Sequence, residues 1–508
     1  MNADLSEELS EALPDELYTA ASVREIDRLA IEEAGIPAIT LMRRAAAACV
    51  EVLMARWPDA TDISVMCGSG NNAGDGYLIA GMLAERHYQV RVTTLGDPRK
   101  ASSAARTAFE YCLQAGVTPQ PVDSEQAMTA DVTVDALLGI GVLGELRPAY
   151  RQLIQKVNQL AQPVLAVDIP SGLCADTGMK LGDAIRADVT VTFLGLKRGL
   201  FTADGPDCAG DIVFDALGCR DDILRHVTGG TQRGNTEKLR FSSLLKTLPS
   251  RPRNAHKNHF GHVLVIGGDQ GMGGAVAMTA EAALRAGAGL VSVATHPAHA
   301  AALLGRCPEL MVRGIQAGSE LTDLVARASV IVLGPGLGQS GWSSMLFDHV
   351  IETTLPMVVD ADGLNLLARR AQRRDNWVLT PHPGEAARLL GPSTLSVDRF
   401  TDIARLQADY GGVVVLKGVG SLVNDGERSS LCPYGNPGMA TAGMGDILSG
   451  VIGALLSQAQ SLGLTNMQAT ELAVAVHALA GDAAALDGQR GMMATDTLPH
   501  IRRLLNRV

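Results

Sequence analysis

The sequence lacks any concentration of positive charge. Its 43 Lys and Arg residues are outnumbered by 54 Asp and Glu residues, which gives a formal net charge of -11. A chain with this charge repels the phosphates of a nucleic acid, and no stripe of Lys and Arg offsets that repulsion. We therefore expect no nucleic acid among its partners.

Signals for export and for membrane insertion are also missing. The segment from Asp4 to Glu16 is acidic and has neither the basic nor the apolar part of a secretory signal. Apolar runs such as 447–456 contain Ser and Gly and fall short of the ~20 residues that cross a bilayer. The eight cysteines form no CxxC pair, so we expect reduced, mostly buried thiols. A cytoplasmic protein without a membrane segment is predicted.

The chain is long enough for two globular domains, with 508 residues of which 46% are hydrophobic. In both halves, short apolar runs alternate with helical patterns, which is typical of parallel sheets covered by helices. The expected strands of the first half are 63–67, 90–95, 132–136, 164–168 and 189–193. Those of the second half are 263–266, 290–294, 330–333, 357–360 and 413–416. We assign two α/β domains to residues 1–225 and 239–508, with a polar linker at 226–238.

A Gly-rich segment with two amides and a carboxylate follows the first predicted strand. It reads GNNAGDG from Gly70 to Gly76 and precedes a helical run that starts at Tyr77. A strand, a Gly-rich turn and a helix N-terminus together form an anion site, but Asp75 would repel a pyrophosphate there. The pattern instead indicates a polar site for sugar hydroxyls, a phosphate edge or a cation.

Two further predicted strands close on carboxylates. Asp135 ends one strand and is followed by Gly139, whereas Asp168 ends another and is followed by Ser171. Carboxylate, hydroxyl and carbonyl oxygens that converge on one rim suit a hard cation. The structural alternative is that each Asp only caps a turn or a helix.

Four segments in this order, GNNAGDG, DALLGIG, AVDIPSG and FLGLKRG, resemble the NAD(P)H-hydrate epimerase family over about residues 15 to 220. The resemblance implies a Rossmann-like three-layer domain, with Asp168 in contact with the substrate as its catalytic acid or base. It implies that the hydrated nucleotide also contacts Asn71, Asn72, Ala73, Gly74, Asp75, Gly139, Ile140, Gly141, Val142, Leu143, Gly144 and Glu145. It implies that potassium (K+) is held by Asn72, Asp135 and Ser171. Ala73 stands where the family loop usually has Gly, and would be strained if that position required a positive φ.

The most specific segment of the second half is NPGMATAGMGD, which ends at Asp446 and leads into a helical run from Ile447. The backbone N–H groups of residues 443–445, at a helix N-terminus, would form an anion hole for a transferring phosphoryl group. Asp446 would stand beside this hole as the base that a phosphoryl transfer to a hydroxyl needs. A Gly-rich tight turn with an Asp cap is the structural alternative.

Other polar or Gly-rich segments follow the predicted strands of this half. They are GPGLG at 334–338, VDADGLN at 359–365, TPHPGE at 380–385 and LKGVGS at 416–421. His382 lies between two prolines on the expected rim, as a rigidly presented site residue or as a structural histidine. Lys417 stands between a strand and a Gly, which favours a phosphate contact over a plain surface charge.

These segments make residues 240 to 505 resemble the ribokinase-like superfamily and, within it, the NAD(P)H-hydrate dehydratases. The resemblance implies a divalent ion, normally magnesium (Mg2+), and ADP as co-substrate. It implies that the hydrated nicotinamide nucleotide contacts Ala275, Gly336, His382 and Asp446. It implies that the adenine nucleotide contacts Lys417, Gly418, Val419, Gly420, Ser421 and Gly445.

Together, the two resemblances predict a bifunctional enzyme that repairs hydrated NADH and NADPH. Hydration gives both epimers at C6, and a stereospecific dehydratase alone would leave one of them behind. ADP would phosphorylate the C6 hydroxyl, and loss of phosphate would then give NAD(P)H, AMP and phosphate. The alternatives are a vitamin-precursor kinase for the second half and a binding or scaffolding module for the first. A homo-oligomer that acts on small molecules is expected.

Overall fold

The computed structural model describes residues 10–97, 102–122, 129–142, 144–219, 236–391 and 396–507. The chain forms two compact units, which we call the N-terminal unit (residues 16–236) and the C-terminal unit (residues 237–508 together with 1–15). Of the predicted linker, residues 226–235 lie outside the described residues. Its last three residues form strand β10 (Thr236–Lys238).

Residues 10–15 belong to the C-terminal unit, although the sequence pattern assigns them to the first domain. The Asp15 carboxylate accepts hydrogen bonds from the Arg240 guanidinium, at 3.0 Å from Nε and 2.8 Å from Nη2. The backbone N–H of Lys238 also donates to the Asp15 carbonyl at 2.6 Å. A bidentate ion pair of this kind fixes the segment to residues more than 200 positions away, which no local pattern indicates.

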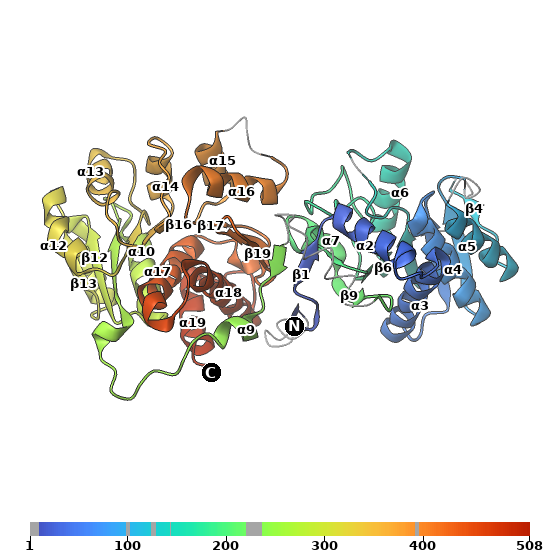
Figure 1. Ribbon diagram of the computed structural model, residues 1–508, viewed down its shortest axis with the longest axis horizontal. Coiled ribbons are helices and arrows are strands. Elements are labelled where there is room, and N and C mark those ends of the chain that lie inside the picture. The colour runs from blue at the N-terminus through green and yellow to red at the C-terminus, as the bar shows by residue number, and fades with distance from the viewer. Residues whose placement is uncertain are drawn as a thin grey trace. The chain divides into compact units, whose positions relative to one another are not determined.

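A parallel sheet forms the centre of the N-terminal unit (Figure 1). Its strand order is β4-β3-β2-β5-β6-β7-β9, and each neighbouring pair is parallel. The strands are β2 (Asp62–Cys67), β3 (Gln89–Thr94), β4 (Gln120–Pro121), β5 (Val132–Ala136), β6 (Val164–Val167), β7 (Val189–Phe193) and β9 (Asp211–Asp215). Strands β1 (Glu16–Tyr18) and β8 (Leu196–Lys197) form a further short parallel pair.

Helices cover both faces of this sheet. On one face, the core contains Ile26 of α2, Leu41 of α3 and Leu78 of α4, whereas Leu153 and Ile154 of α6 pack on the other face. The helices are α2 (Ala20–Glu32), α3 (Ala38–Arg56), α4 (Asn71–Glu85), α5 (Ser103–Gln114), α6 (Pro148–Gln159) and α7 (Gly205–Ala209), with the short η2 (Arg198–Phe201). Burial on both faces explains why the central strands are unbroken apolar runs.

The C-terminal unit contains a larger sheet, whose strand order from one edge is β13-β12-β11-β14-β15-β16-β17-β18-β19. The pairs from β13 to β17 are parallel, and β18 and β19 add an antiparallel meander. The strands are β11 (His262–Ile266), β12 (Leu290–Thr295), β13 (Met311–Gly314), β14 (Val330–Leu333), β15 (Met357–Val359), β16 (Trp377–Leu379), β17 (Val413–Leu416), β18 (Ser421–Asn424) and β19 (Ser429–Cys432).

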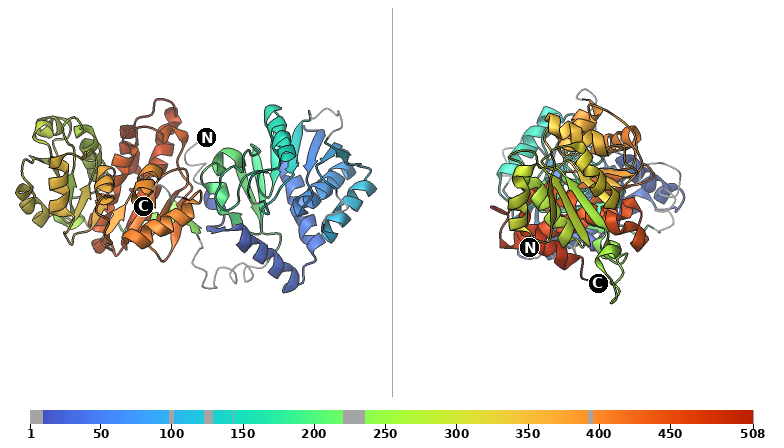
Figure 2. Two further views of the ribbon diagram at one scale, coloured as in Figure 1. Left: turned by 90° about the horizontal axis from the view of Figure 1, so that it is seen from above. Right: turned by 90° about the vertical axis from the view of Figure 1, so that its left-hand side faces the viewer.

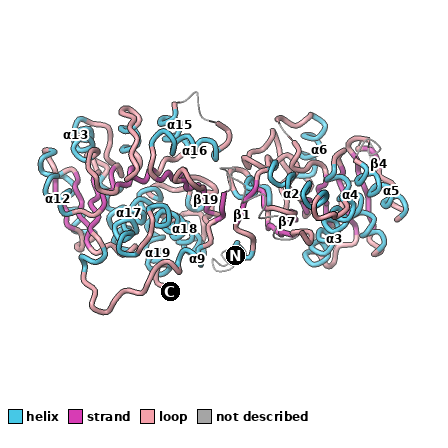
Figure 3. The backbone as a smooth tube through the Cα atoms, in the orientation of Figure 1, coloured by secondary structure: helices cyan, strands magenta, loops and turns pink. Residues whose placement is uncertain are grey.

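Helices also lie on both sides of this second sheet. Figures 1 and 3 show α13 to α16 on one side of the strands and α17, α18 and α19 on the other. The longer helices are α10 (Gly273–Arg285), α13 (Gly341–Val350), α15 (Pro383–Leu390), α16 (Arg399–Tyr410), α17 (Met444–Leu462) and α18 (Asn466–Ala484). The shorter ones are α9 (Phe241–Leu245), α11 (Ala300–Arg306), α12 (Thr322–Arg327), α14 (Asp362–Leu367) and α19 (Leu498–Leu504). Figure 2 gives the same elements from two further sides.

A sharp turn between α17 and α18 joins the two most buried helices of the molecule. Gly463 adopts a left-handed φ of 68° and ends α17, and the Thr465 hydroxyl accepts from the backbone N–H of Gln468 to begin α18. The segment Asn466–Asp487 is long and apolar enough to cross a membrane, but 78% of its most apolar window is buried inside the unit. A core helix of a folded domain passes the same test of length and composition.

All ten predicted strands are present, within one residue at most ends. The two strands predicted to end in aspartate, 164–168 and 357–360, stop one residue earlier, so that Asp168 and Asp360 begin the following turns. Both α/β domains are therefore confirmed in type. The eight cysteines carry free thiols, seven of them buried, as predicted.

Candidate active sites

The first candidate site is a cavity of about 590 Å³ at the edge where β2, β5, β6 and β7 end. Parallel strands bring their carboxyl ends to one edge, so segments far apart in the sequence meet there. The predicted substrate residues that line it are Asn71, Asn72, Asp75, Gly139, Ile140, Gly141, Val142 and Asp168. Within the described part of the chain, Ala73, Gly74, Gly144 and Glu145 do not line it, and Leu143 lies outside the described residues.

The GNNAGDG segment begins helix α4 and does not merely precede it. The helix starts at Asn71, so the predicted start at Tyr77 is wrong. Gly74 packs closely inside this helix, since a Cβ there would lie 2.6 Å from the Met42 sulfur and would require that side chain to shift. Ala73 is buried within α4 and is not among the residues with positive φ, so its replacement of the usual Gly causes no strain.

The predicted potassium ligands lie together around one backbone carbonyl. Asn72 Nδ2 donates to the Leu138 oxygen at 3.2 Å, and Ser171 Oγ lies 3.2 Å from the same oxygen and 2.6 Å from Asp135 Oδ1. The Asp135 carboxylate is 0% exposed, and burial raises its pKa to about 6 although hydrogen bonds from Ser171 and Leu137 oppose the shift. Carboxylate, hydroxyl and carbonyl oxygens in one place form a donor set that suits a hard cation, and the Asn72 amide lies beside them.

Asp168 has an unusual backbone conformation at the carboxyl end of β6. Its φ is +69°, a left-handed value that is uncommon outside Gly and that clusters at functional sites. Its Oδ1 accepts a hydrogen bond from the Phe193 backbone N–H at 3.2 Å and forms an ion pair with Lys197. The side chain is thus held at the cavity wall from the neighbouring strand β7 and from β8.

Other carboxyl groups face the same cavity. Burial raises the pKa of Asp75 well above its usual range, and the negative charges of Asp168 and Asp27 add to the effect. Burial also raises the pKa of Asp27, again with a contribution from Asp168. Asp27 lies on α2, and only the tertiary fold brings it here, so no sequence pattern marks it. Lys197 lies inside the FLGLKRG segment, and that motif is the signal by which the sequence could have identified it.

The second candidate site lies at the strand ends of the C-terminal unit and contains a buried ion pair. Lys417 Nζ lies 2.7 Å from Asp360 Oδ1 and 3.8 Å from Glu385 Oε2. Ser449 Oγ donates to the second Asp360 oxygen at 2.7 Å. Burial disfavours the charged amine, but the carboxylates of Asp360 and Glu385 outweigh it and raise the pKa of Lys417. Lys417 is therefore a cation inside the unit and not a surface charge.

Asp446 lies in the first turn of α17, which begins at Met444 and not at the predicted Ile447. The first N–H groups of a helix have no intrahelical partner, so this turn presents donors to an anion. A Cβ at Gly445 would lie 3.3 Å from Lys417 Nζ, which places that turn against the buried cation. Burial raises the pKa of Asp446 to about 7, with Asp360 adding to the shift and Lys417 opposing it. A carboxyl group with this pKa can act as a base near neutral pH.

The predicted nucleotide segment, residues 417–421, is held in place by Arg399 at the start of α16. The guanidinium donates to the carbonyls of Leu416 at 3.1 Å, Lys417 at 3.2 Å and Gly420 at 3.1 Å, and it also donates to the Val419 carbonyl. Burial lowers the pKa of Arg399 to about 10. Sequence reasoning missed this residue, because it lies 18 positions before the segment and matches no local motif.

The remaining predicted substrate residues of this unit lie on the same edge of the sheet. Gly336 has a φ of +58°, and a Cβ there would lie 3.0 Å from the Ala275 Cβ and 2.6 Å from the Met272 carbonyl. Gly336 and Ala275 are therefore neighbours, and only Gly is tolerated at position 336. His382 caps α15 by accepting from the Glu385 backbone N–H at 3.3 Å, and its side chain is 50% exposed. It is a structural cap that also faces the rim.

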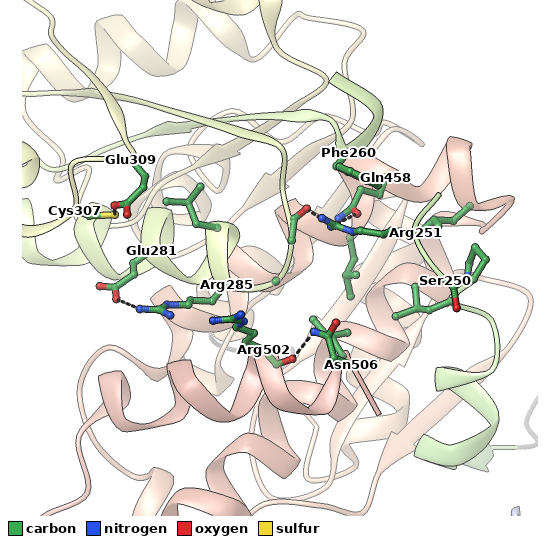
Figure 4. Close-up of a pocket in the computed structure, with 18 of the residues that line it drawn as sticks. Ser250, Arg251, Phe260, Glu281, Arg285, Cys307, Glu309, Gln458, Arg502 and Asn506 are labelled. Carbon is green, nitrogen blue, oxygen red and sulfur yellow. Dashed lines mark hydrogen bonds and ion pairs between the residues drawn. The ribbon is translucent and has the colours of Figure 1, made fainter. Parts of the chain in front are cut away.

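A separate cavity of about 850 Å³ lies at the other ends of α10 and α17 (Figure 4). Its charges are largely engaged: Arg306 pairs with Glu281 at 3.0 Å, and the Arg251 guanidinium stacks on the Phe260 ring at 3.7 Å. None of its described lining residues is a predicted site residue. The chemistry of this unit is therefore expected at the N-terminal ends of these helices.

Two protein-family models match the chain. The model of the YjeF-related protein N-terminus matches residues 38–199, and the model of NAD(P)H-hydrate dehydratase matches residues 263–503. Each match covers most of the strands and the site segments of one unit.

Curated relatives extend over nearly the whole chain. A bifunctional NAD(P)H-hydrate repair enzyme of Coxiella burnetii is 47% identical over 96% of this chain and 99% of that protein. The enzyme of the same description from Escherichia coli is 42% identical over 97% of this chain and 95% of that protein. Among solved structures, an ADP/ATP-dependent NAD(P)H-hydrate dehydratase of Bacillus subtilis, co-crystallised with ATP and Mg2+, is 25% identical with a TM-score of 0.46, covering 53% of this chain and 96% of that chain. A ribokinase-like superfamily protein of Enterococcus faecalis is 30% identical with a TM-score of 0.49, covering 53% of this chain and 95% of that chain.

The fold and the two strand-end sites define a two-domain α/β enzyme with a ribokinase-like second domain. The chain belongs to the family of bifunctional NAD(P)H-hydrate repair enzymes, since relatives of that description match it from end to end. The predicted family, α/β fold and bifunctional repair activity are therefore confirmed. The vitamin-precursor kinase and the scaffolding module are not supported by these matches.

Proposed function

We propose that the N-terminal unit interconverts the two C6 epimers of hydrated NADH and NADPH in the cavity lined by Asn71, Asn72, Asp75 and Asp168. The observation that supports this assignment is the convergence of four strand ends on one polar cavity, where Asp168 has a left-handed φ of +69°. Asp168 acts as the acid or base, and the loop 139–145 contacts the nucleotide. Ala73 and Gly74 are buried in α4 and do not line the cavity, so their contacts with the nucleotide stay a prediction from the family resemblance.

The same proposal assigns Asn72, Asp135 and Ser171 to a potassium ion. The Asp135 carboxylate, the Ser171 hydroxyl and the Leu138 carbonyl supply oxygens of the kind that bind a monovalent cation, and the Asn72 amide lies beside them. When bound, the ion would supply positive charge beside the loop that receives the anionic nucleotide. The ion would also offset the burial that raises the pKa of the Asp135 carboxyl to about 6.

The C-terminal unit removes water from the S epimer with ADP as the phosphoryl donor. Asp446 takes the proton of the C6 hydroxyl, whose oxygen attacks the terminal phosphorus of ADP while AMP leaves. The N–H groups of residues 443–445 and the ammonium of Lys417 stabilise the charge on the transferring group. The C6–O bond then breaks, C5 loses a proton and the ring double bond reforms, which releases phosphate and NAD(P)H. Ala275, Gly336 and His382 contact the nicotinamide part.

The segment 417–421 and Gly445 bind the adenine nucleotide, and a magnesium ion accompanies its phosphates. Among the described residues, no cluster of three or more His, Cys, Asp or Glu side chains forms a ready metal site. This fits Mg2+, which keeps several waters and takes few protein ligands besides substrate phosphates. Glu385 and Asp360 are the carboxylates that would hold it, and the ion would neutralise phosphate charge when bound.

The proposal is tested by incubating the whole chain with a mixture of both hydrates of NADH, in the presence of ADP, Mg2+ and K+. We expect NADH and AMP in equal amounts, and consumption of both epimers. A phosphorylated product that accumulates without NADH would replace the dehydratase with a kinase. Consumption of one epimer alone would remove the epimerase assignment.

Location and assembly are proposed on the sequence alone. The family acts on small molecules, which agrees with the predicted hydrated nucleotides and ADP as the substrates. Cytoplasmic location, absence of nucleic-acid and membrane partners, and a homo-oligomeric state stay predictions.

A further inference from the structure

A buried lysine behind the wall of the epimerase cavity has no role in the function proposed so far. The Lys197 side chain is 0% exposed, and its ammonium donates to Thr192 Oγ1 at 3.0 Å, to the Phe193 carbonyl at 2.9 Å and to Asp168 Oδ1. An ammonium has three protons, so these three acceptors use all of its donors. Burying such a group is costly, since removal of a charge from water is repaid only by close partners.

The two carboxylate oxygens of Asp168 have different surroundings, because the Lys197 ammonium binds only Oδ1. Oδ1 receives the Lys197 ammonium and the Phe193 backbone N–H, and it lies 3.4 Å from the Thr192 hydroxyl. Among the described residues, no hydrogen bond given by the structure reaches Oδ2, and Asp168 lines the cavity. With one oxygen fixed from behind and the backbone held at a φ of +69°, the second oxygen is presented in one direction.

The three carboxyl groups that line the cavity do not share the same electrostatic surroundings. Asp27, Asp75 and Asp168 all line it, but the buried ammonium contacts only Asp168. Burial and the charge of Asp168 favour the protonated form of Asp75, as its raised pKa shows. Environments that separate two carboxyl groups in this way assign one of them as base and the other as acid.

We propose that Lys197 is a positioning residue that holds one oxygen of Asp168 and so orients Asp168 as the base of the epimerase site, and that Asp75 is the acid that works with it. The inference rests on the proposed epimerase function. It adds Asp75 as the second proton-transfer group of the site, and it gives Lys197 as the residue that makes the surroundings of Asp168 and Asp75 different.

The proton transfers balance in a reaction that opens and closes the hydrated ring. Asp168 takes the proton of the C6 hydroxyl, the C6–N1 bond breaks, and C6 becomes an aldehyde. The electron pair goes to N1, which takes a proton from Asp75. The aldehyde group then rotates so that its opposite face meets N1. N1 attacks C6 and returns its proton to Asp75, while the oxygen regains a proton from Asp168. The opposite epimer is formed without any oxidant or reductant.

The test measures conversion of the pure S hydrate of NADH to the R hydrate by the full chain, with ADP omitted so that the dehydratase is silent. We expect Lys197→Met and Asp75→Asn each to lower kcat by about 10²-fold or more, with KM changed by less than about threefold, as for loss of a positioned acid or base. The matched control is Lys238→Met, which removes another fully buried lysine, paired with Asp15 at 3.7 Å in the other unit. It should keep the wild-type rate of epimerisation.

A double-mutant cycle separates positioning from plain stability. If Lys197 acts through Asp168, adding Lys197→Met to Asp168→Asn should lower kcat by less than about twofold, because contacting groups are not additive. The double variant also removes both buried charges, so it should fold even if Lys197→Met alone does not. Independent losses that multiply, or a Lys197→Met variant near the wild-type rate, would overturn the proposal. Failure of the wild-type chain to epimerise would overturn the proposed function instead.

Discussion

The substitution Asp446→Asn gives the sharpest test of the dehydratase site, because it keeps the shape of the side chain and removes the proton acceptor. We expect the variant to stop releasing AMP from ADP and the S hydrate of NADH. Loss of a positioned base costs about 10²- to 10⁴-fold in rate. At 1.36 kcal/mol per decade, this is roughly 3 to 5 kcal/mol of barrier.

The pH dependence of the wild-type chain should identify the same group. Since burial raises the pKa of Asp446 to about 7, kcat for dehydration should rise with pH through that value as the carboxyl group ionises. The variant has no such group, so the rise should be absent from its remaining activity.

The free energy of unfolding provides an independent measurement, and it should fall over the pH range in which kcat rises. The folded state binds the Asp446 proton more tightly than the unfolded chain, whose carboxyl has the ordinary pKa of 3.8. Stability is therefore lost as pH rises from about 4 to about 7 and is constant above that. The shift corresponds to at most about 4 kcal/mol, and solvent at the partly exposed carboxyl reduces this figure. The variant should thus melt no lower than the wild type at pH 8.

The assay follows AMP release and NADH absorbance, with epimerisation of the same hydrates as the internal control. Epimerisation should remain at the wild-type rate, because Asp446 and the cavity of Asp168 belong to different units. Retained dehydration would show that Asp446 only caps the turn. Loss of both activities in a folded variant would mean that the units share one site, and the separation of functions would be wrong.

Three further predictions concern the ions, the nucleotide and its loop. Replacing K+ by a bulky organic cation should slow epimerisation, because a bulky ion would not fit among the closely spaced side chains of the predicted ligands; equal rates in the two buffers would remove the potassium assignment. ADP should support faster dehydration than ATP in parallel rate measurements, on the family resemblance, and a clear advantage of ATP would contradict this. Arg399→Met should raise the KM for ADP about tenfold or more, roughly 1.4 kcal/mol, since four carbonyls of the loop lose their donor. Its kcat should change little, and an unchanged KM would show that the loop is held without Arg399.

The sequence by itself determined the fold class and most of the chemistry. Strands buried on both faces must be continuous apolar runs, so all ten predicted strands are present. Parallel strands end at one edge, so polar segments that follow strands must meet, which is why Asn72, Asp135 and Ser171 converge around Leu138. Asp446 beside its helix N-terminus could be predicted for the same local reason.

Only the tertiary structure decided which groups support these residues. Arg399 reaches the nucleotide segment from the start of another helix, and Lys197 reaches Asp168 from a neighbouring strand. Asp27 enters the epimerase cavity from α2, and the Asp15 ion pair with Arg240 attaches residues 10–15 to the C-terminal unit. Such contacts join positions that are far apart in the chain, and they depend on the packing of whole elements. A local pattern of residue types carries no information about that packing, whereas it does specify where a strand ends and which residues form the turn after it.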